Sequence, residues 1–128
     1  MRTPGPQPDT PVPHVRHHCH DDLLWVIVLS GDIEDAVVAL VEEATLRAER
    51  ATAHLLVYDL DAMGFCDSSL LNHLLRTARR RHVVLAGTNP FMDRLLDVTG
   101  VGHVFTRVAT LDAARSLTTD ERVVDDRQ

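Results

Sequence analysis

Apolar residues follow two different patterns along this chain. Continuous apolar runs favour buried strands, and they lie at 23–31, 53–60, 82–87 and 103–108, with a weaker candidate at 14–22. Between these runs, apolar residues recur every three or four positions, which is the spacing of one helical face. This spacing predicts helices at 33–48, 67–80, 90–99 and 111–117.

Residues at the ends of these segments support the predicted boundaries. Gly31 closes the first strong strand, and Gly100 is suited to end the third helix. Asn89 suits the N-cap of that helix, whose first turn holds Pro90. Thr110 can cap the last helix through its hydroxyl.

Each of the two longer helices has one apolar face. In the first helix this face consists of Ile33, Val37, Leu40, Val41, Ala44 and Ala48. In the second it consists of Leu70, Leu71, Leu74, Leu75 and Ala78, and the outward side carries Asn72, His73, Arg76, Arg79 and Arg80. We therefore expect both helices to cover a sheet with one side only.

The order of the elements predicts one α/β domain. Helices alternate with the later strands, which favours parallel strands joined by right-handed crossovers. We expect a mixed β-sheet of about four to five strands, with amphipathic helices packed mainly on one face. The domain should span 14–120, between a disordered leader at 1–13, which holds five of the six prolines, and a polar tail at 121–128.

Composition narrows the range of functions. The chain has 128 residues and a formal net charge of -6, which argues against direct contact with nucleic acid. All 13 basic residues are arginine, so mechanisms that need a lysine amine are excluded. Cys19 and Cys66 form no paired framework, and the apolar run at 23–29 is too short to cross a membrane. We expect a cytoplasmic protein with no membrane contact.

The segment Phe-Cys-Asp-Ser-Ser-Leu-Leu at 65–71 lies where a strand gives way to a helix. Asp67 can accept a hydrogen bond from a free backbone N–H of the new helix. Ser68 and Ser69 then occupy the first turn, near the positive end of the helix dipole. That position suits a phosphate, but an N-cap alone also explains these residues.

Several catalytic or metal-binding interpretations compete with a regulatory one. A nucleophilic serine needs an activating base, but no Gly-x-Ser-x-Gly motif is present, and His73 lies one and a half turns beyond Ser68. The run His-His-Cys-His at 17–20 has metal-ligand chemistry, but adjacent strand residues point to opposite faces. We therefore expect no enzyme activity, no cofactor and no metal.

Two further polar features leave alternatives open. Asp59 ends a buried strand and is followed by Asp61, as in the phosphoacceptor region of a response-regulator receiver. Receivers also need an acidic pair after the first strand and a lysine, whereas Asp21 and Asp22 stand before a strand here. The basic run at 76–81 complements a helix C-terminus, and it could also contact an acidic partner.

Taken in order, these segments resemble a known family. The stretch LLVYDLDAMGFCDSSLLNHLLRTARRR at 55–81 resembles the central part of STAS domains, especially bacterial anti-sigma factor antagonists. The stretch HVVLAGTNPFMDRLLDVTGVGHVFTRVATLDAARS at 82–116 resembles the second half of that family, and WVIVLSGDIE at 25–34 looks like its early strand. The resemblance covers about residues 20–118.

The resemblance implies a regulatory function. Antagonists of this type bind an anti-sigma factor, usually a serine kinase, and so free a sigma factor. The kinase phosphorylates the serine that directly follows the aspartate, which here is Ser68, with Ser69 as the second candidate. A phosphatase restores binding. The resemblance places the partner contact at Asp67, Ser68, Ser69, Leu70 and His73.

The chain departs from the family at one position of this motif. The family usually has glycine after the two serines, where this chain has Leu70. Glycine lets the backbone of a partner come close, so a leucine can hinder a kinase. The alternative interpretation is a STAS-type module that binds a ligand or a protein and is not regulated by phosphorylation.

Overall fold

The computed structural model describes residues 14–20, 24–51 and 55–117. The elements are β1 (His14–His20), β2 (Leu24–Ile33), α1 (Asp35–Arg50), β3 (Leu55–Cys66), α2 (Ser68–Ala78), β4 (Val83–Ala86), α3 (Pro90–Thr99), a 3-10 turn (Gly102–Val104) and β5 (Thr106–Val108). Residues 111–117 are also helical. The predicted leader at 1–13 and tail at 121–128 lie outside the described residues.

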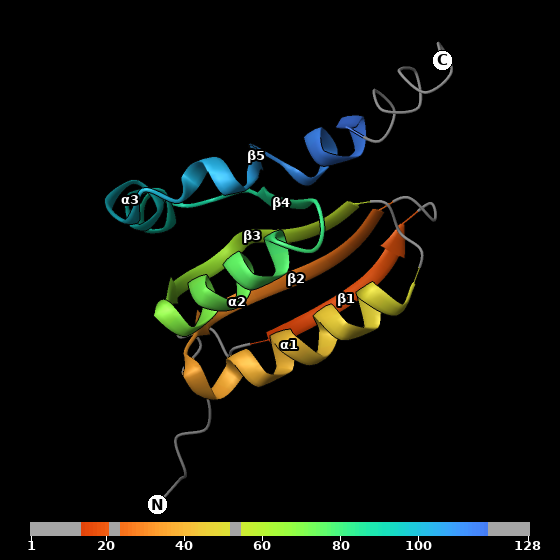
Figure 1. Ribbon diagram of the computed structural model, residues 1–128, viewed down its shortest axis with the longest axis horizontal. Helices are drawn as coiled ribbons and strands as arrows, with labels where there is room; N and C mark the ends of the chain where they lie inside the picture. The colour runs from red at the N-terminus through yellow and green to blue at the C-terminus, as the bar shows by residue number, and fades with distance from the viewer. Residues whose placement is uncertain (1–13, 21–23, 52–54, 118–128) are drawn as a thin grey trace, which may run out of the picture.

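The five strands form one mixed sheet in the order β1-β2-β3-β4-β5. β1 runs antiparallel to β2, and the other neighbours are parallel. Parallel neighbours need a crossover, and α1, α2 and α3 supply the three crossovers. Figure 1 shows the sheet with α1 and α2 lying in front of it. The predicted single α/β domain is confirmed.

Each face of the sheet has its own core. The larger core joins one face to α1, α2 and α3 through residues such as Leu29, Val41, Leu74 and Leu96. The smaller core covers the opposite face, where Ala114 packs against strand residues of β2, β3 and β4. Three helices therefore lie on one face, which confirms the prediction that the helices pack mainly on one face. The short helical segment 111–117 lies on the other face, which was not predicted.

β3 is longer than predicted. The segment 62–65, which the sequence predicts as a connector, continues the strand, because it pairs with the last residues of β2. This added pairing contains register shifts between Val28 and Ser30 and between Gly31 and Ile33. β4 pairs only with Leu56–Asp59, so β2 and β3 project beyond β4 and end where α1 and α2 begin.

Two further expectations need correction. Residues 103–105, predicted as strand, belong mainly to the 3-10 turn, so β5 starts only at Thr106. The buried face of α1 holds Val38 and Thr45 in place of Leu40, which is 55% exposed. No helix among the described segments is long and apolar enough to span a membrane.

Candidate functional site

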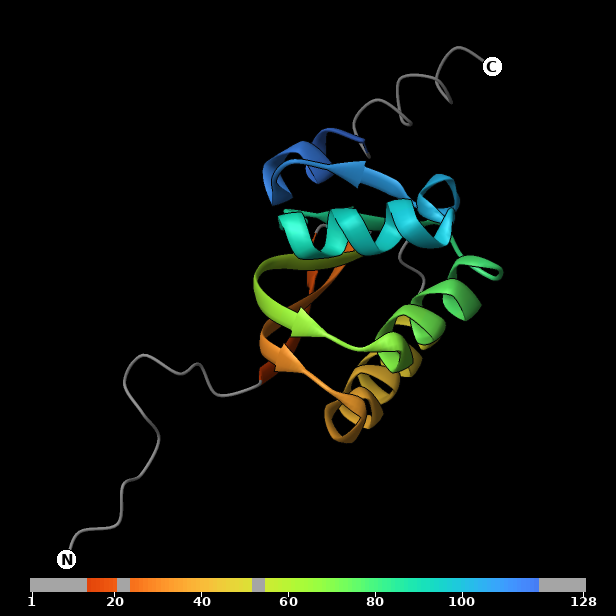
Figure 2. The same ribbon diagram turned by 90° about the vertical axis from the view of Figure 1, so that its left-hand side faces the viewer.

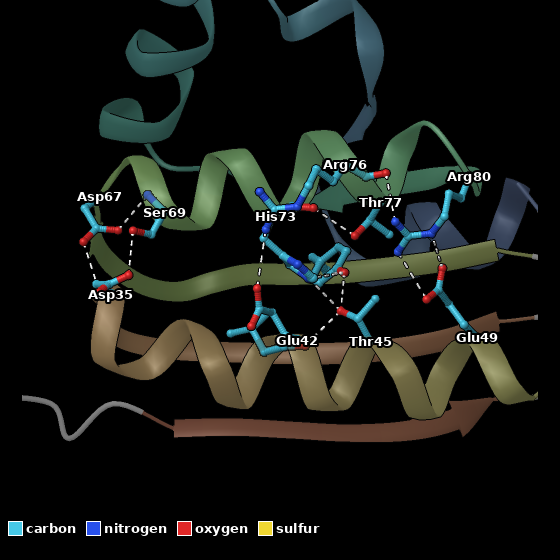
Figure 3. A network of polar contacts seen from close by, with 12 residues as sticks. Asp35, Glu42, Thr45, Glu49, Asp67, Ser69, His73, Arg76, Thr77 and Arg80 are labelled. Carbon is cyan, nitrogen blue, oxygen red and sulfur yellow. Dashed lines mark hydrogen bonds and ion pairs between the residues drawn. The ribbon is translucent and has the colours of Figure 1, made fainter.

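Asp67 joins the first turns of α1 and α2. One carboxylate oxygen, Oδ1, accepts a hydrogen bond from the Ser69 N–H at 3.0 Å, which caps α2. The other, Oδ2, accepts from the Asp35 N–H at 2.9 Å, at the start of α1. Each of these amides lies in a first turn, where no intrahelical partner exists. The predicted N-cap is confirmed, and it also connects two helices (Figure 3).

The two serines of the motif have different surroundings. Ser69 is half-buried, and its hydroxyl donates to Oδ1 of Asp35 at 2.9 Å. Ser68 is the first residue of α2 and is exposed. A group that must enter a kinase active site needs an accessible hydroxyl, and Ser68 provides one at the positive end of the helix dipole.

The residues directly before Asp67 are held by the β2–α1 turn. Oδ1 of Asp32 accepts a hydrogen bond from the Phe65 N–H at 3.0 Å. A Cβ at Gly64 would lie 2.7 Å from the same oxygen, so a side chain there would displace the Asp32 carboxylate from this hydrogen bond. Asp32 therefore fixes the backbone that presents Phe65, which is 45% exposed.

Asn89 connects this region to a third turn. Its side-chain amide donates to the carbonyls of Met63 at 2.8 Å and Gly64 at 3.0 Å. Its Oδ1 accepts a hydrogen bond from the Met92 N–H at 2.8 Å, which confirms the predicted N-cap of α3. The connection brings Phe91 beside Phe65, with ring centroids 5.2 Å apart.

The site therefore combines three turns that follow β2, β3 and β4. The carboxyl ends of parallel strands meet at one edge of a sheet, where ligand and partner sites commonly lie. Figure 2 turns this end of the molecule toward the viewer, with the starts of α1 and α2 below α3. Sequence analysis did not assign functional roles to Asp32, Asp35, Asn89 or Phe91, although their positions after predicted strands were a usable signal.

His73 does not lie on the outer side of α2, so that expectation is wrong. Its side chain is 6% exposed, and its Nε2 lies 2.9 Å from the Thr45 hydroxyl and 3.4 Å from the Tyr58 hydroxyl. These two polar partners, on α1 and β3, make an inward position favourable. His73 is thus engaged away from Ser68 and is not placed as its general base.

Leu70 is fully buried, in agreement with its predicted place on the apolar face of α2. Its bulk therefore fills the core and does not surround Ser68. The side chains of both Leu70 and His73 are buried in the folded domain. Their predicted contact with a partner stays a prediction, while Asp67, Ser68 and Ser69 lie together at the surface of the site.

Burial changes the acid–base chemistry near the site. Burial raises the pKa of Tyr58 to about 12 and lowers the pKa of His73. Two smaller effects act on His73: the Glu42 charge raises its pKa and the Arg76 charge lowers it. Burial also raises the pKa of the Cys66 thiol to about 11, and the neighbouring Asp67 carboxylate raises it further. At neutral pH all three groups are therefore uncharged.

The other candidate polar segments are the aspartates Asp59 and Asp61 of β3, the run at 17–20 and the basic run at 76–81. Asp59 Oδ1 accepts a hydrogen bond from the Asp61 N–H at 3.1 Å, a local contact at a strand end. Among the residues whose side chains the structure describes, no three His, Cys, Asp or Glu side chains could jointly hold a metal ion. The side chains of the run 17–20 fall outside that description. Arg76 and Arg80, from the basic run, pair with Glu42 and Glu49 of α1.

Comparison with known proteins gives a consistent result. The model of the STAS domain family matches residues 14–114. An anti-sigma factor antagonist from Mycobacterium paratuberculosis has 25% sequence identity and a TM-score of 0.75, covering 87% of this chain and 96% of that one. No curated protein sequence matches this chain.

Two more distant structures share the fold. The anti-sigma factor antagonist SpoIIAA in its unphosphorylated form has 17% identity and a TM-score of 0.68, covering 83% of this chain and 98% of that one. The Bacillus cell fate determinant SpoIIAA in the phosphorylated form has 15% identity and a TM-score of 0.62, covering 81% and 99%. Because the family model matches most of the chain, from the first strand to the last helix, this protein belongs to the STAS domain family.

Proposed function

We propose that this protein is an anti-sigma factor antagonist of the cytoplasm. It binds an anti-sigma factor of the serine kinase type and thereby frees a sigma factor. Phosphorylation of Ser68 by that kinase ends the binding, and a phosphatase restores it. The observation that carries this proposal is the exposure of Ser68 at the start of α2, while the Ser69 hydroxyl is bonded to Asp35.

The position of Ser68 suits a switch that acts without unfolding the domain. A phosphate adds about -1.5 to -2 charge at neutral pH. At a helix N-terminus the dipole and free N–H groups accept that charge, so we expect the fold to persist. The burial of Leu70 supports access by a kinase, because this departure from the family pattern places its bulk in the core.

Release of the partner follows from the cost of dehydrating the phosphate. An interface that covers the neutral Ser68 hydroxyl would have to enclose a dianion beside Asp67. Desolvating such a charge without a partner costs several kcal/mol, and about 1.4 kcal/mol corresponds to a tenfold change in affinity. The modification is therefore sufficient to separate the two proteins.

Phosphate mapping tests this proposal. The purified chain is incubated with ATP and each serine-kinase-type anti-sigma factor of the same genome, and the phosphate is located by mass spectrometry. We expect one phosphate, at Ser68, absent from Ser68→Ala and present in the control Ser69→Ala. Phosphate at another residue would contradict the proposal, and so would the absence of phosphorylation by every one of these kinases.

The charge argument has its own test. Ser68→Asp should unfold at nearly the wild-type temperature but bind the anti-sigma factor at least about tenfold more weakly, because a charge replaces the hydroxyl in the interface. Ser68→Ala should retain binding and serves as the matched control. Equal affinities of the Asp and Ala variants would show that charge at residue 68 does not control the interaction.

A further inference from the structure

An exposed aromatic pair lies next to Ser68. Phe65 and Phe91 contact each other but remain 45% and 40% exposed. Their backbones are fixed by the hydrogen bonds of Asp32 and Asn89. Large aromatic side chains that are held in place and left uncovered are typical of the central residues of protein interfaces.

The charged residues in the three strand–helix junctions at this pair are all carboxylates. The three strand–helix junctions at 30–36, 64–69 and 88–92 contain no arginine or histidine. They contain four carboxylates, which are Asp32, Glu34, Asp35 and Asp67. Cations follow directly after these junctions: Arg94 lies one turn beyond Phe91 on α3, and Arg107 pairs with Asp93 at 3.5 Å.

The opposite ends of the two long helices carry the compensating charge. The last turns of α1 and α2 and the residues just after α2 are rich in arginine: Arg47, Arg50, Arg76, Arg79, Arg80 and Arg81. Arg47, Arg76 and Arg80 pair with glutamates of α1, so the positive charge there is partly neutralised. The described part of the molecule thus has an acidic end, which holds Ser68, and an end where arginines outnumber carboxylates. A surface potential of one sign attracts and orients a partner of the other sign.

Helix stability explains only part of the acidic end. Asp35 and Asp67 lie at helix N-termini, where a negative charge is favourable, and Asp32 binds a backbone N–H. Glu34 makes no capping hydrogen bond with its side chain. Glu34 is the N-cap residue of α1 through its backbone carbonyl, so its side-chain charge is not needed for a capping hydrogen bond. The exposed rings of Phe65 and Phe91 have no role in capping and need another explanation.

We infer that Phe65, Phe91 and the carboxylates around them form the docking surface for the anti-sigma factor, an inference that rests on the proposed function. The complementary surface of that partner has an apolar recess that receives the two rings, surrounded by arginine or lysine side chains. The rings supply the buried contact area, and the opposite charges orient the approach and fix the register.

Two variants test this docking surface. Phe91→Ala removes one ring, and Glu34→Arg reverses one charge without breaking a capping bond. The matched controls are Val98→Ala, which truncates a residue of α3 that is 75% exposed, and Glu43→Arg, which reverses an exposed charge farther along α1. All four variants should remain folded, because none of the altered side chains is buried, and thermal unfolding of each variant checks this.

Affinity is measured for each serine-kinase-type anti-sigma factor of the same genome at about 50 mM and about 300 mM salt. We expect Phe91→Ala to weaken binding at least about tenfold at both salt concentrations. Glu34→Arg should weaken binding mainly at low salt and reduce its salt dependence, and the controls should stay within about twofold of the wild type.

The outcomes separate this inference from the proposed function. If none of these anti-sigma factors binds the wild-type chain, both are overturned. If the wild type binds and both variants behave like their controls, the docking surface is wrong while the function stands. If only one of the two variants loses affinity, the inference that the partner combines an apolar recess with surrounding cations is wrong.

Discussion

At the scale of single residues, the Thr45 hydroxyl determines the direction of a buried hydrogen-bond network. It donates its one hydrogen to the Val41 carbonyl at 2.9 Å. It must therefore accept from the Tyr58 hydroxyl at 2.6 Å and from Nε2 of His73 at 2.9 Å. Because burial holds Tyr58 protonated, with a pKa of about 12, that hydroxyl is always available as a donor.

This network makes stability depend on pH. Burial lowers the pKa of His73 below its ordinary value of 6.5, so the unfolded chain binds a proton more readily than the folded one. The stabilising contribution is complete above the unfolded pKa and is lost as the pH falls through the folded pKa.

We therefore expect the unfolding temperature to fall as the pH is lowered from about 7 toward 5. His73→Gln should flatten this dependence while lowering stability at neutral pH. Thermal unfolding at several pH values measures both effects, with His103→Gln, at an exposed residue, as the control. Equal pH dependence in wild type and His73→Gln would show that another group is responsible.

Asp67 provides a second prediction at this scale. Asp67→Ala removes acceptors from the N–H groups of both Asp35 and Ser69, so the free energy of unfolding should fall by about 1–3 kcal/mol. The free energy of unfolding of Asp67→Asn should lie between those of the wild type and Asp67→Ala, because an amide offers one acceptor oxygen where the carboxylate offers two. Urea unfolding measures the differences, with Asp97→Ala, at an exposed residue of α3, as the control.

If Asp67→Asn is as stable as the wild type, one of the two hydrogen bonds contributes nothing. If Asp67→Ala is also as stable, Asp67 has no structural role at the starts of the two helices. Both results come from unfolding of the isolated protein, so their interpretation does not depend on a partner protein.

At the scale of elements, helix positions were predictable but their rotation was less so. Five apolar residues follow one another at 37–41, so the pattern of α1 is compatible with more than one buried face. The structure buries Val38 and Thr45 and leaves Leu40 exposed. Thr45 is counted as polar in a sequence pattern, but its hydroxyl finds three partners in the folded protein.

The same reasoning explains the error at His73. An imidazole beside arginines on a helix suggests a solvated face. Only the folded arrangement reveals that residues of α1 and β3, 28 and 15 positions away, offer it hydrogen-bonding partners. Contacts between segments so far apart in sequence leave no local pattern.

Asn89 connects two elements and gives a prediction at this scale. Asn89→Asp retains an acceptor for the Met92 N–H but loses the donors to the Met63 and Gly64 carbonyls, whereas Asn89→Ala loses both functions. The free energy of unfolding should fall by about 1–3 kcal/mol for Asn89→Ala and by a smaller amount for Asn89→Asp.

Urea unfolding of both variants checks this order, and NMR contacts between the rings of Phe65 and Phe91 report whether the third turn stays in place. Asn72→Ala, at an exposed residue of α2, is the control. Intact ring contacts in Asn89→Ala would show that Asn89 does not position Phe91.

At the scale of the whole molecule, the fold was predictable because apolar runs and helical faces alternate regularly along the chain. The family resemblance agrees with the match to STAS domains over 14–114. The order of the strands within the sheet was not predicted and comes from the structure. The composition of the site was only half predictable. Asp67 and Ser68 lie in one recognisable motif, whereas Phe91, which contacts Phe65, lies 26 residues beyond it in the sequence.

The separation of acidic and basic ends has a consequence for how the protein meets other molecules. A body with opposite charge at its two ends has a permanent electric dipole moment. In the field of a charged partner it experiences a torque, and at physiological ionic strength this acts within about 8 Å of contact. The end that carries Ser68 is then turned forward before the surfaces touch, so fewer collisions are wasted on unproductive orientations.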